Sequence, residues 1–251
     1  MTIDNPFAAE GIGVQYARGR PYHHPVTLGR ALALLGVTRA AAALDVACGT
    51  GLSTRALADV ADRVAGCEVS PAMLSVAPML DNVSYVRAAA ESMPFARASF
   101  DGATVASAVH WFDQGRFFAE MHRVLRPGGW LVLYDHYFLC AIRDVPEADE
   151  WGRRFSERYP LPPRSRSTGE TGIAPGELFE AVAEEFFDND QDMDFDAFVD
   201  YVCSQSNAVA AGERREPVRE WVIETAAPLF AGARRAVRFL SAVTCFRRLP
   251  R

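Results

Sequence analysis

The sequence predicts an α/β fold, in which helices cover both faces of a doubly wound, mostly parallel sheet. Between residues 42 and 134, short apolar strands alternate with helical segments, a pattern typical of parallel strands joined by crossover helices. A glycine-containing loop follows the first strand, and an acidic residue lies at the end of each of the first two strands. Because ligands of such sheets bind at the carboxyl ends of the strands, we expect a ligand site along that edge.

The loop after the first strand is the most informative motif. Leu44-Asp45-Val46 ends the strand, and Ala47-Cys48-Gly49-Thr50-Gly51 leads into a predicted helix. Glycine lets the backbone come close to a ligand. Thr54 stands at the third small position of the dinucleotide fingerprint, and the Gly-Lys-Ser/Thr ending of a P-loop is missing. A carboxylate at Asp45 would repel phosphate and attract a cation, so the loop predicts a ligand without phosphate.

Glu68 ends the second predicted strand. In nucleotide-binding βαβ folds, an acid about 20 residues after the first strand binds both ribose hydroxyls. Ser70-Pro71, directly after Glu68, predicts the start of the next helix. The simpler interpretation of Glu68 is a solvated charge at a strand end. Asp45 and Glu68 together also fit a nicotinamide enzyme.

Three further motifs follow in order. Residues 88–95 read Ala-Ala-Ala-Glu-Ser-Met-Pro-Phe, residues 99–101 read Ser-Phe-Asp, and residues 123–129 read Arg-Val-Leu-Arg-Pro-Gly-Gly. With the acid-x-x-x-Gly-x-Gly loop, this series resembles the class I S-adenosylmethionine (SAM) methyltransferases, over roughly residues 10–136. The resemblance implies a Rossmann-like, seven-stranded, mostly parallel sheet with an antiparallel last strand and a small helical lid. It also implies SAM as cofactor and a small-molecule substrate.

Two segments narrow the resemblance. Residues 107–113, Ser-Ala-Val-His-Trp-Phe-Asp, and residues 16–22, Tyr-Ala-Arg-Gly-Arg-Pro-Tyr, are similar to the trans-aconitate methyltransferase-like group. His23 and His24 stand where that group usually has Tyr and Pro. Ala89 stands where many methyltransferases have an aspartate for the adenine amino group, so adenine is expected to rest on the backbone and on apolar contacts.

The resemblance implies cofactor-binding residues at the strand ends and in an N-terminal flap. Arg20 is expected to pair with the methionine carboxylate, and its alternative is a surface charge. Cys48 is expected to be a small side chain beside the ligand. The predicted cofactor-binding residues are Tyr16, Arg20, Asp45, Ala47, Cys48, Gly49, Gly51, Glu68, Val69, Met73, Ala89, Ala90, Glu91, Ser107 and Ala108. No cluster of metal-binding side chains at helical spacing occurs, so no metal site is expected.

His110 and His136 are the candidate catalytic residues, because they follow the fourth and fifth predicted strands. Histidine titrates near neutral pH, and a base speeds transfer to a hydroxyl or amine by roughly 10²–10⁴. A carboxylate acceptor needs no base and is bound by arginine. His110 can instead buttress the loop beside Trp111, and His136 can line the substrate site. The resemblance suggests methyl transfer to a carboxylate or hydroxyl oxygen.

The 251 residues, 49% of them apolar, predict a single domain over residues 1–251. We expect a flap and first helix in residues 1–36, a cofactor-binding core in residues 37–136, and lid or substrate insertions in residues 137–175 and 195–230. Further elements are less regular. They are predicted helices over 145–159, 177–186, 195–204 and 215–229, strands over 187–193 and 236–246, and a stiff exposed loop over 160–166.

The composition of the chain excludes some classes of partner. A formal net charge of −6 argues against a nucleic-acid substrate, and no apolar run reaches the length of a membrane span. Five scattered cysteines and the lack of a signal pattern predict a reducing, cytoplasmic location. The absence of lysine suggests a GC-rich bacterial genome. A monomer or homodimer is expected.

Other functions fit parts of the pattern. A SAM-binding enzyme that does not methylate, of the cyclase or decarboxylase type, would keep the same pocket. A nicotinamide oxidoreductase is the next alternative, although Asp45 and Thr54 speak against it. A pure interaction module is least favoured, because the strand-end residues of a cofactor site are all present.

Overall fold

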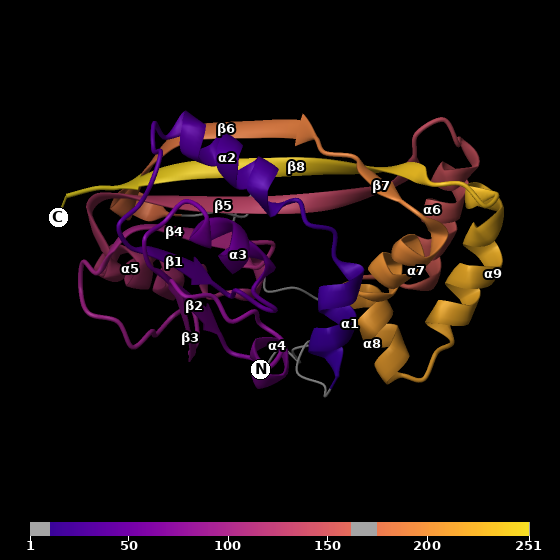
Figure 1. Ribbon diagram of the computed structural model, residues 1–251, viewed down its shortest axis with the longest axis horizontal. Helices are drawn as coiled ribbons and strands as arrows, with labels where there is room; N and C mark the ends of the chain where they lie inside the picture. Colours follow the sequence, from indigo (N-terminus) through magenta and orange to yellow (C-terminus); the bar gives the residue numbers. More distant parts are fainter. Residues whose placement is uncertain (1–10, 162–174, 251) are drawn as a thin grey trace.

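The computed structural model describes residues 11–161 and 175–250, which form one sheet of eight strands. The strand order is β3-β2-β1-β4-β5-β8-β6, and the short β7 pairs with β8 (Figure 1). The strands are β1 (Ala43–Val46), β2 (Val64–Glu68), β3 (Val83–Arg87), β4 (Phe100–Ala106), β5 (Leu125–Ile142), β6 (Phe179–Asp188), β7 (Gln191–Met193) and β8 (Arg235–Arg248). β1 to β5 pair in parallel, whereas β8 is antiparallel to β5, β6 and β7. The predicted α/β architecture with a mostly parallel sheet is confirmed.

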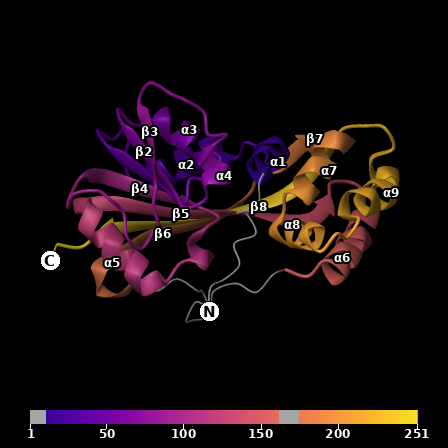
Figure 2. The ribbon, with the colours of Figure 1, turned by 90° about the horizontal axis from the view of Figure 1, so that it is seen from below.

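Helices cover both faces of the parallel strands. Leu44 and Val46 of β1 lie in one apolar cluster with α5, whereas Ala43 lies in another cluster with α2 and α3. Successive strand residues point to opposite faces, so each helix layer receives alternate side chains. Figure 2 shows α5 on the other side of the sheet from α2 and α3. The helices are α2 (His24–Leu34), α3 (Leu52–Ala58), α4 (Pro71–Leu74) and α5 (Gln114–Val124). We call β1–β4 with α2–α5 the parallel core.

A second group of helices gathers at the far end of β5 and β8. It consists of α6 (Glu147–Arg158), α7 (Phe195–Cys203), α8 (Ser206–Glu213) and α9 (Val218–Phe230) (Figure 1). We call α6–α9 the helical lobe. Trp151, Phe155, Phe198 and Phe230 form its apolar centre, to which Phe239 of β8 also belongs. β5 and β8 therefore connect the lobe to the parallel core.

Helix α1 (Ile12–Gly19) lies between the parallel core and the helical lobe (Figures 1 and 2). A Cβ placed on Gly13 would lie 2.3 Å from the carbonyl oxygen of Ala72 in α4. A Cβ placed on Gly19 would lie 2.3 Å from the carbonyl oxygen of Asp200 in α7. Glycine at both positions lets α1 pack closely on both sides.

One predicted element has the wrong type. Residues 177–186 were expected to form a helix, but residues 179–188 form strand β6, paired antiparallel to β8. Between Ala181 and Ala183 the register shifts, so Val182 is an extra residue in this strand. Such a bulge interrupts the alternation of apolar side chains by which a strand is recognised. The apolar residues of the segment therefore recur with a helical period.

Most other predicted elements after residue 137 are confirmed. The helices predicted over 145–159, 195–204 and 215–229 are α6, α7 and α9, and the strand predicted over 236–246 is β8. Of the strand predicted over 187–193, residues 187–188 end β6 and residues 191–193 form β7. Helix α8 was not predicted, and β5 is longer than expected. Residues 162–166 of the predicted exposed loop lie outside the described residues. In the ranges described, no helix combines the length and apolar character needed to cross a bilayer.

Candidate active site

The loop between β1 and α3 is built from residues with positive φ. Ala47, Gly49 and Gly51 have φ of 54°, 55° and 79°, and Gly51 is the N-cap of α3. A Cβ on Gly51 would lie 2.7 Å from both Pro78 and the hydroxyl of Tyr85. Gly51 therefore serves the packing of the loop, and its predicted contact with a cofactor stays a prediction.

Asp45 lies beneath this loop and is completely buried. Its carboxylate accepts hydrogen bonds from the hydroxyls of Ser53 (2.7 Å), Thr54 (2.6 Å) and Thr104 (3.0 Å). Burial raises the pKa of Asp45 to about 6, although these three hydroxyl donors oppose the shift. Asp45 therefore holds the loop and α3 against β4, and its predicted role in cofactor binding stays a prediction.

Glu68 sits at the end of β2, facing the loop. Its Oε2 accepts a hydrogen bond from the backbone N–H of Gly49 at 3.0 Å. Its Oε1 accepts from the backbone N–H groups of Val69 and Ser70 at 2.9 and 2.8 Å. The carboxylate is therefore fixed by backbone donors on two elements. It still lines a cavity, where the remaining lone pair of Oε2 can accept a hydrogen bond from a ligand.

That first cavity has a volume of about 280 Å³ and follows the carboxyl ends of β1, β2 and β4. Residues of the strand ends, α1 and α4 line it. They are Tyr16, Ala47, Gly49, Glu68, Val69, Met73, Ala88, Ala89, Ala90, Glu91, Ala106, Ser107, Ala108, Trp111 and Phe112. Most predicted cofactor-binding residues thus surround one space. Ala88, Ala106, Trp111 and Phe112 were not among them, although Trp111 and Phe112 belong to the segment that suggested the family resemblance.

Strained backbone flanks this cavity. Ala47 and Ser107 have φ of 54° and 52°, in the left-handed region that side chains other than glycine seldom adopt. They follow the adjacent parallel strands β1 and β4. Such residues persist only where the surrounding structure holds them, and they concentrate at functional sites. The strain therefore supports a ligand site at this point of the sheet.

A second, smaller cavity of about 60 Å³ adjoins the glycine loop. Arg20 and Cys48, two predicted cofactor-binding residues, line it, and so does His136. The ring of His23 stacks on His136 with centroids 4.2 Å apart, and Nδ1 of His24 lies 2.9 Å from the Tyr134 hydroxyl. The sequence placed His23 and His24 in a loop and gave them no role.

The three clustered histidines are held as neutral rings, with His23 buried and His24 and His136 half-buried. Burial lowers the pKa of His23 to about 3 and that of His24 to about 4, with their neighbouring cationic groups adding to the effect. Burial also lowers the pKa of His136 well below its usual range. Burial raises the pKa of the Cys48 thiol, which keeps it protonated and unsuited to act as a nucleophile.

A third cavity of about 250 Å³ lies between the end of β5 and the helical lobe. His110 and His136 both line it, together with aromatic side chains that include Trp111 and Tyr201. Arg20 also reaches it, while its guanidinium donates a 3.0 Å hydrogen bond to the carbonyl of Ser204. Tyr16 and Ser107 line all three cavities, so the three spaces adjoin one another around these two residues.

The described residues contain no set of three or more histidine, cysteine, aspartate or glutamate side chains arranged to hold a metal ion. The cavities instead offer apolar surface, backbone groups, the carboxylates of Glu68, Glu91 and Asp135, and one arginine, Arg20. Such a set suits an organic ligand with polar ends better than a metal centre.

Comparisons with known proteins agree with this geometry. Residues 44–133 match the family model described as a methyltransferase domain. The chain is 37% identical over 131 residues to an O-methyltransferase of Aspergillus sclerotiorum, covering 49% of this chain and 48% of that protein. It is 40% identical over 100 residues to malonyl-[acyl-carrier protein] O-methyltransferase of Pseudescherichia vulneris, covering 39% of this chain and 40% of that one.

The chain spans about half, or less, of the length of these curated relatives. Likeness to solved structures extends further. A protein of Anaeromyxobacter dehalogenans assigned as a type II methyltransferase is 26% identical, with a TM-score of 0.69, over 89% of this chain and 97% of the other. Residues 44–133 of this chain therefore match a methyltransferase domain, and the fold is similar to that of a methyltransferase of known structure.

Proposed function

We propose that the protein transfers a methyl group from SAM to an oxygen atom of a small-molecule acceptor. The observation that carries the proposal is Glu68 at the end of β2, held by backbone donors and facing the cavity beside the glycine loop. A fixed carboxylate at this place suits a ribose hydroxyl. The named O-methyltransferases among the relatives support oxygen as the acceptor atom.

The residues fit the chemistry of this cofactor. Glu68 would accept a hydrogen bond from the ribose, while Met73, Ala89 and Ala90 offer apolar surface and backbone groups to adenine. Arg20 lies in the adjoining second cavity, where it suits the methionine carboxylate. When bound, SAM supplies a methyl group already activated by its positive sulfur. No residue of this set needs to act as a nucleophile.

The protein's own task is then to position the acceptor. We assign the third cavity to it, because this space shares Tyr16 and Ser107 with the first and second cavities. Holding two reactants in the reactive geometry can supply roughly 7–11 kcal/mol of the barrier. The aromatic side chains Trp111 and Tyr201 suit a small, partly apolar acceptor. His110 is the candidate to accept a proton where the acceptor is a hydroxyl.

Incubation with methyl-labelled SAM and a panel of small acids, phenols and amines tests this function. We expect label in an acid or a phenol and not in amines. Glu68→Ala should weaken binding of S-adenosylhomocysteine by about tenfold or more, because hydrogen bonds to a charged group contribute about 1.5–3 kcal/mol. Glu150→Ala, which removes an exposed carboxylate of α6, is the matched control and should bind normally. Labelling of no acceptor class would refute the proposal.

The same assay separates the proposal from the non-methylating alternative. A cyclase or decarboxylase that uses SAM only for its charge would not transfer label. Its turnover would instead continue when S-adenosylhomocysteine replaces SAM.

A further inference from the structure

The second cavity concentrates buried polar atoms that lack a partner. Arg20 Nε, His23 Nδ1, Thr50 Oγ1 and His136 Nε2 are all buried, and none has a hydrogen-bond partner within the described residues. All four side chains line this one space of about 60 Å³. Buried polar atoms are nearly always paired, so such a cluster indicates a polar ligand. No described residue that lines the cavity is acidic, and Arg20 gives it a positive charge.

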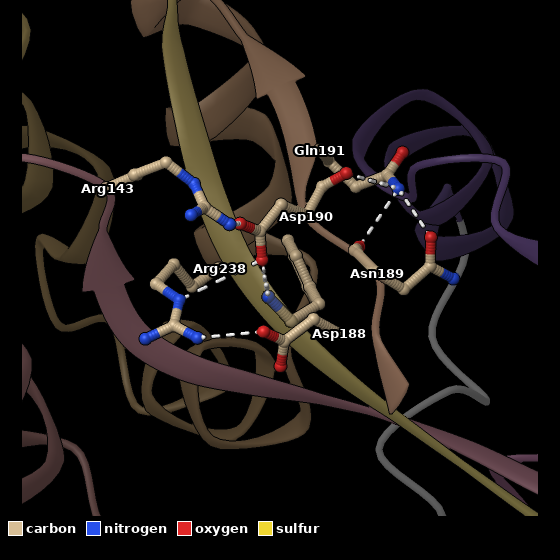
Figure 3. A network of polar contacts seen from close by, with 7 residues as sticks. Arg143, Asp188, Asn189, Asp190, Gln191 and Arg238 are labelled. Atoms are coloured by element: carbon tan, nitrogen blue, oxygen red, sulfur yellow. Dashed lines mark hydrogen bonds and ion pairs between the residues drawn. The ribbon is translucent and has the colours of Figure 1, made fainter. Parts of the chain in front are cut away.

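A chain of hydrogen bonds runs from the bend between β6 and β7 to His136, and it determines which ring nitrogen of His136 carries the hydrogen. Nε2 of Gln191 contacts the backbone carbonyl oxygens of Asn189 and Asp190, both at 3.1 Å (Figure 3). Carbonyl oxygens only accept, so this end of the Gln191 amide must be the donor. It also donates to Oδ1 of Asn189 at 3.2 Å. The Asn189 amide is therefore oriented with Nδ2 on its other side.

From Asn189 the chain of hydrogen bonds continues to His136. Nδ2 of Asn189 donates to Oγ of Ser241 at 3.0 Å, and Oγ of Ser241 lies 2.9 Å from Nδ1 of His136. Ser241 is completely buried, and its hydroxyl has no other acceptor in the part of the chain that is described. An unused buried donor costs about 1–3 kcal/mol, so the hydroxyl hydrogen points to Nδ1. A neutral His136 then carries its own hydrogen on Nε2, as a donor.

The bend that holds Asn189 is anchored on both sides. Asp190 pairs with Arg143, which directly follows β5, and Asp188 pairs with Arg238 of β8 at 3.2 Å (Figure 3). The backbone N–H of Asn189 donates to the carbonyl of Phe239 at 2.9 Å. These contacts fix the amide of Asn189 relative to β8. Ring stacking by His23, 4.2 Å away, holds His136 from its other face.

We propose that Asn189 and Ser241 are positioning residues that keep His136 as the Nε2–H tautomer, so that His136 and Arg20 together bind a carboxylate in the second cavity. His136 then serves binding and specificity rather than proton removal. This inference rests on the proposed function, which supplies two sources of a carboxylate: the methionine end of the cofactor and the acceptor. Both sources share the same chemistry, and both suit two fixed N–H donors and a positive charge.

The tautomer is measurable without any ligand. Protein labelled with ¹⁵N in histidine, with His136 assigned by its loss in His136→Phe, should show hydrogen on Nε2. Asn189→Asp is the sharpest variant, since the carboxylate that it introduces can accept the Ser241 hydrogen but cannot donate. Ser241 would then accept from Nδ1, and the hydrogen of His136 should move to Nδ1. Ser99→Ala is the control, because it removes the hydroxyl of an exposed hydrogen bond that does not belong to this chain of contacts. It should leave the tautomer unchanged. Hydrogen on Nδ1 in the unaltered protein would overturn the inference.

Calorimetry identifies the source of the carboxylate. S-adenosylhomocysteine is compared with 5′-methylthioadenosine, which lacks the amino-acid end, and benzoate and succinate serve as acceptor probes. If the cofactor supplies the carboxylate, Asn189→Asp and His136→Phe should each lower the affinity for S-adenosylhomocysteine about tenfold or more. Their affinity for 5′-methylthioadenosine should be unchanged. If the acceptor supplies it, the same variants should weaken a carboxylate probe by a similar factor and spare both nucleosides.

Unchanged binding of all four ligands in both variants would overturn the inference. A wild-type protein that binds neither nucleoside would instead refute the proposed function. The tautomer measurement on the ligand-free protein would still decide the role of Asn189 and Ser241, so the two failures are distinguishable.

Discussion

The parallel core and the helical lobe are stabilised in different ways. In the parallel core, polar side chains and unusual backbone fix the loop, as Asp45 shows with its three hydroxyl donors. In the lobe, aromatic rings do most of the packing, with Trp151 stacked on Phe155 at 5.4 Å. This difference shows which parts of the structure can be recognised from the sequence. A loop that needs particular residues leaves a motif, whereas apolar packing accepts many sequences and leaves none.

Helix α1 joins these two regions and completes the site. Gln15 donates to the carbonyl of Cys203 at 2.8 Å, and Arg18 pairs with Asp200 of α7 at 2.5 Å. On its other side, α1 packs on α4 through Gly13. Tyr16, between these contacts, lines all three cavities. The lobe therefore helps to shape the third cavity through α1.

The largest effect on stability is expected from Trp151→Ala. Trp151 is 3% exposed, stacks on Phe155 and donates a 2.9 Å hydrogen bond to the hydroxyl of Thr225. Truncation should lower the free energy of unfolding, measured in urea, by about 3–5 kcal/mol. Hydrogen exchange should show the loss in α6–α9 first, with Trp151→Phe as a milder control. Equal loss of protection in β1–β4 would mean that the two regions are one cooperative unit.

A pH-dependent effect is expected from Asp45→Asn in the parallel core. Because burial raises the folded-state pKa of Asp45 from 3.8 to about 6, its contribution to stability is present below pH 3.8 and is lost as pH rises through 6. Relative to Asp45→Asn, the unaltered protein should lose about 2–3 kcal/mol between pH 4 and pH 7. Urea unfolding at both pH values measures this difference. A difference that does not change with pH would show that Asp45 is not perturbed by burial.

The two close contacts of α1 can be broken separately. Gly13→Ala pushes α1 against α4, and Gly19→Ala pushes it against α7, each at a cost of about 1–3 kcal/mol. Gly29→Ala, with open space around its Cβ position in α2, is the matched control and should gain about 0.5–1 kcal/mol.

Binding distinguishes the two glycine variants further. We expect Gly13→Ala to weaken 5′-methylthioadenosine, because α4 carries Met73 of the first cavity. Gly19→Ala should leave the affinity for that ligand unchanged and lower the affinity for acceptors, because Gly19 adjoins Arg20 and the lobe. Identical binding profiles would show that α1 acts as one rigid unit.

The strand ends of the parallel core were predictable because short-range signals fix them. A glycine loop after a strand and an acid after the next strand define one edge of the sheet, and the structure places Ala47 and Glu68 there around one cavity. The burial of Asp45 was not predictable. One of its donors, Thr104, comes from a different strand, and the sequence does not show which lone pairs are already occupied.

Features that depend on distant pairing also escaped prediction. The bulge at Val182 led to the wrong prediction for β6, because the spacing of apolar residues in this segment fits a helix. Only the pairing of β6 with β8 shows that the segment is a strand. His23 and His136 are far apart in the sequence, and only the fold stacks them. The third cavity joins residues of two motif segments, such as Tyr16 and Trp111, to residues of the helical lobe, such as Tyr201, and only the fold brings these together.

The smallest expected effect is at this histidine cluster, and its sign is opposite to that of Asp45. Burial lowers the pKa of His23 from 6.5 to about 3, with His24 and Arg20 facing it as further cationic groups and His136 stacked beside it. Its contribution to stability is therefore present above pH 6.5 and is lost as pH falls toward 3. His23→Phe keeps the ring contacts to His136 and Phe239 but removes the titration. Between pH 7.5 and pH 5.5, the unaltered protein should lose about 1.4 kcal/mol more than this variant, as measured by urea unfolding. An equal loss in both proteins would show that His23 takes up a proton while the protein is folded.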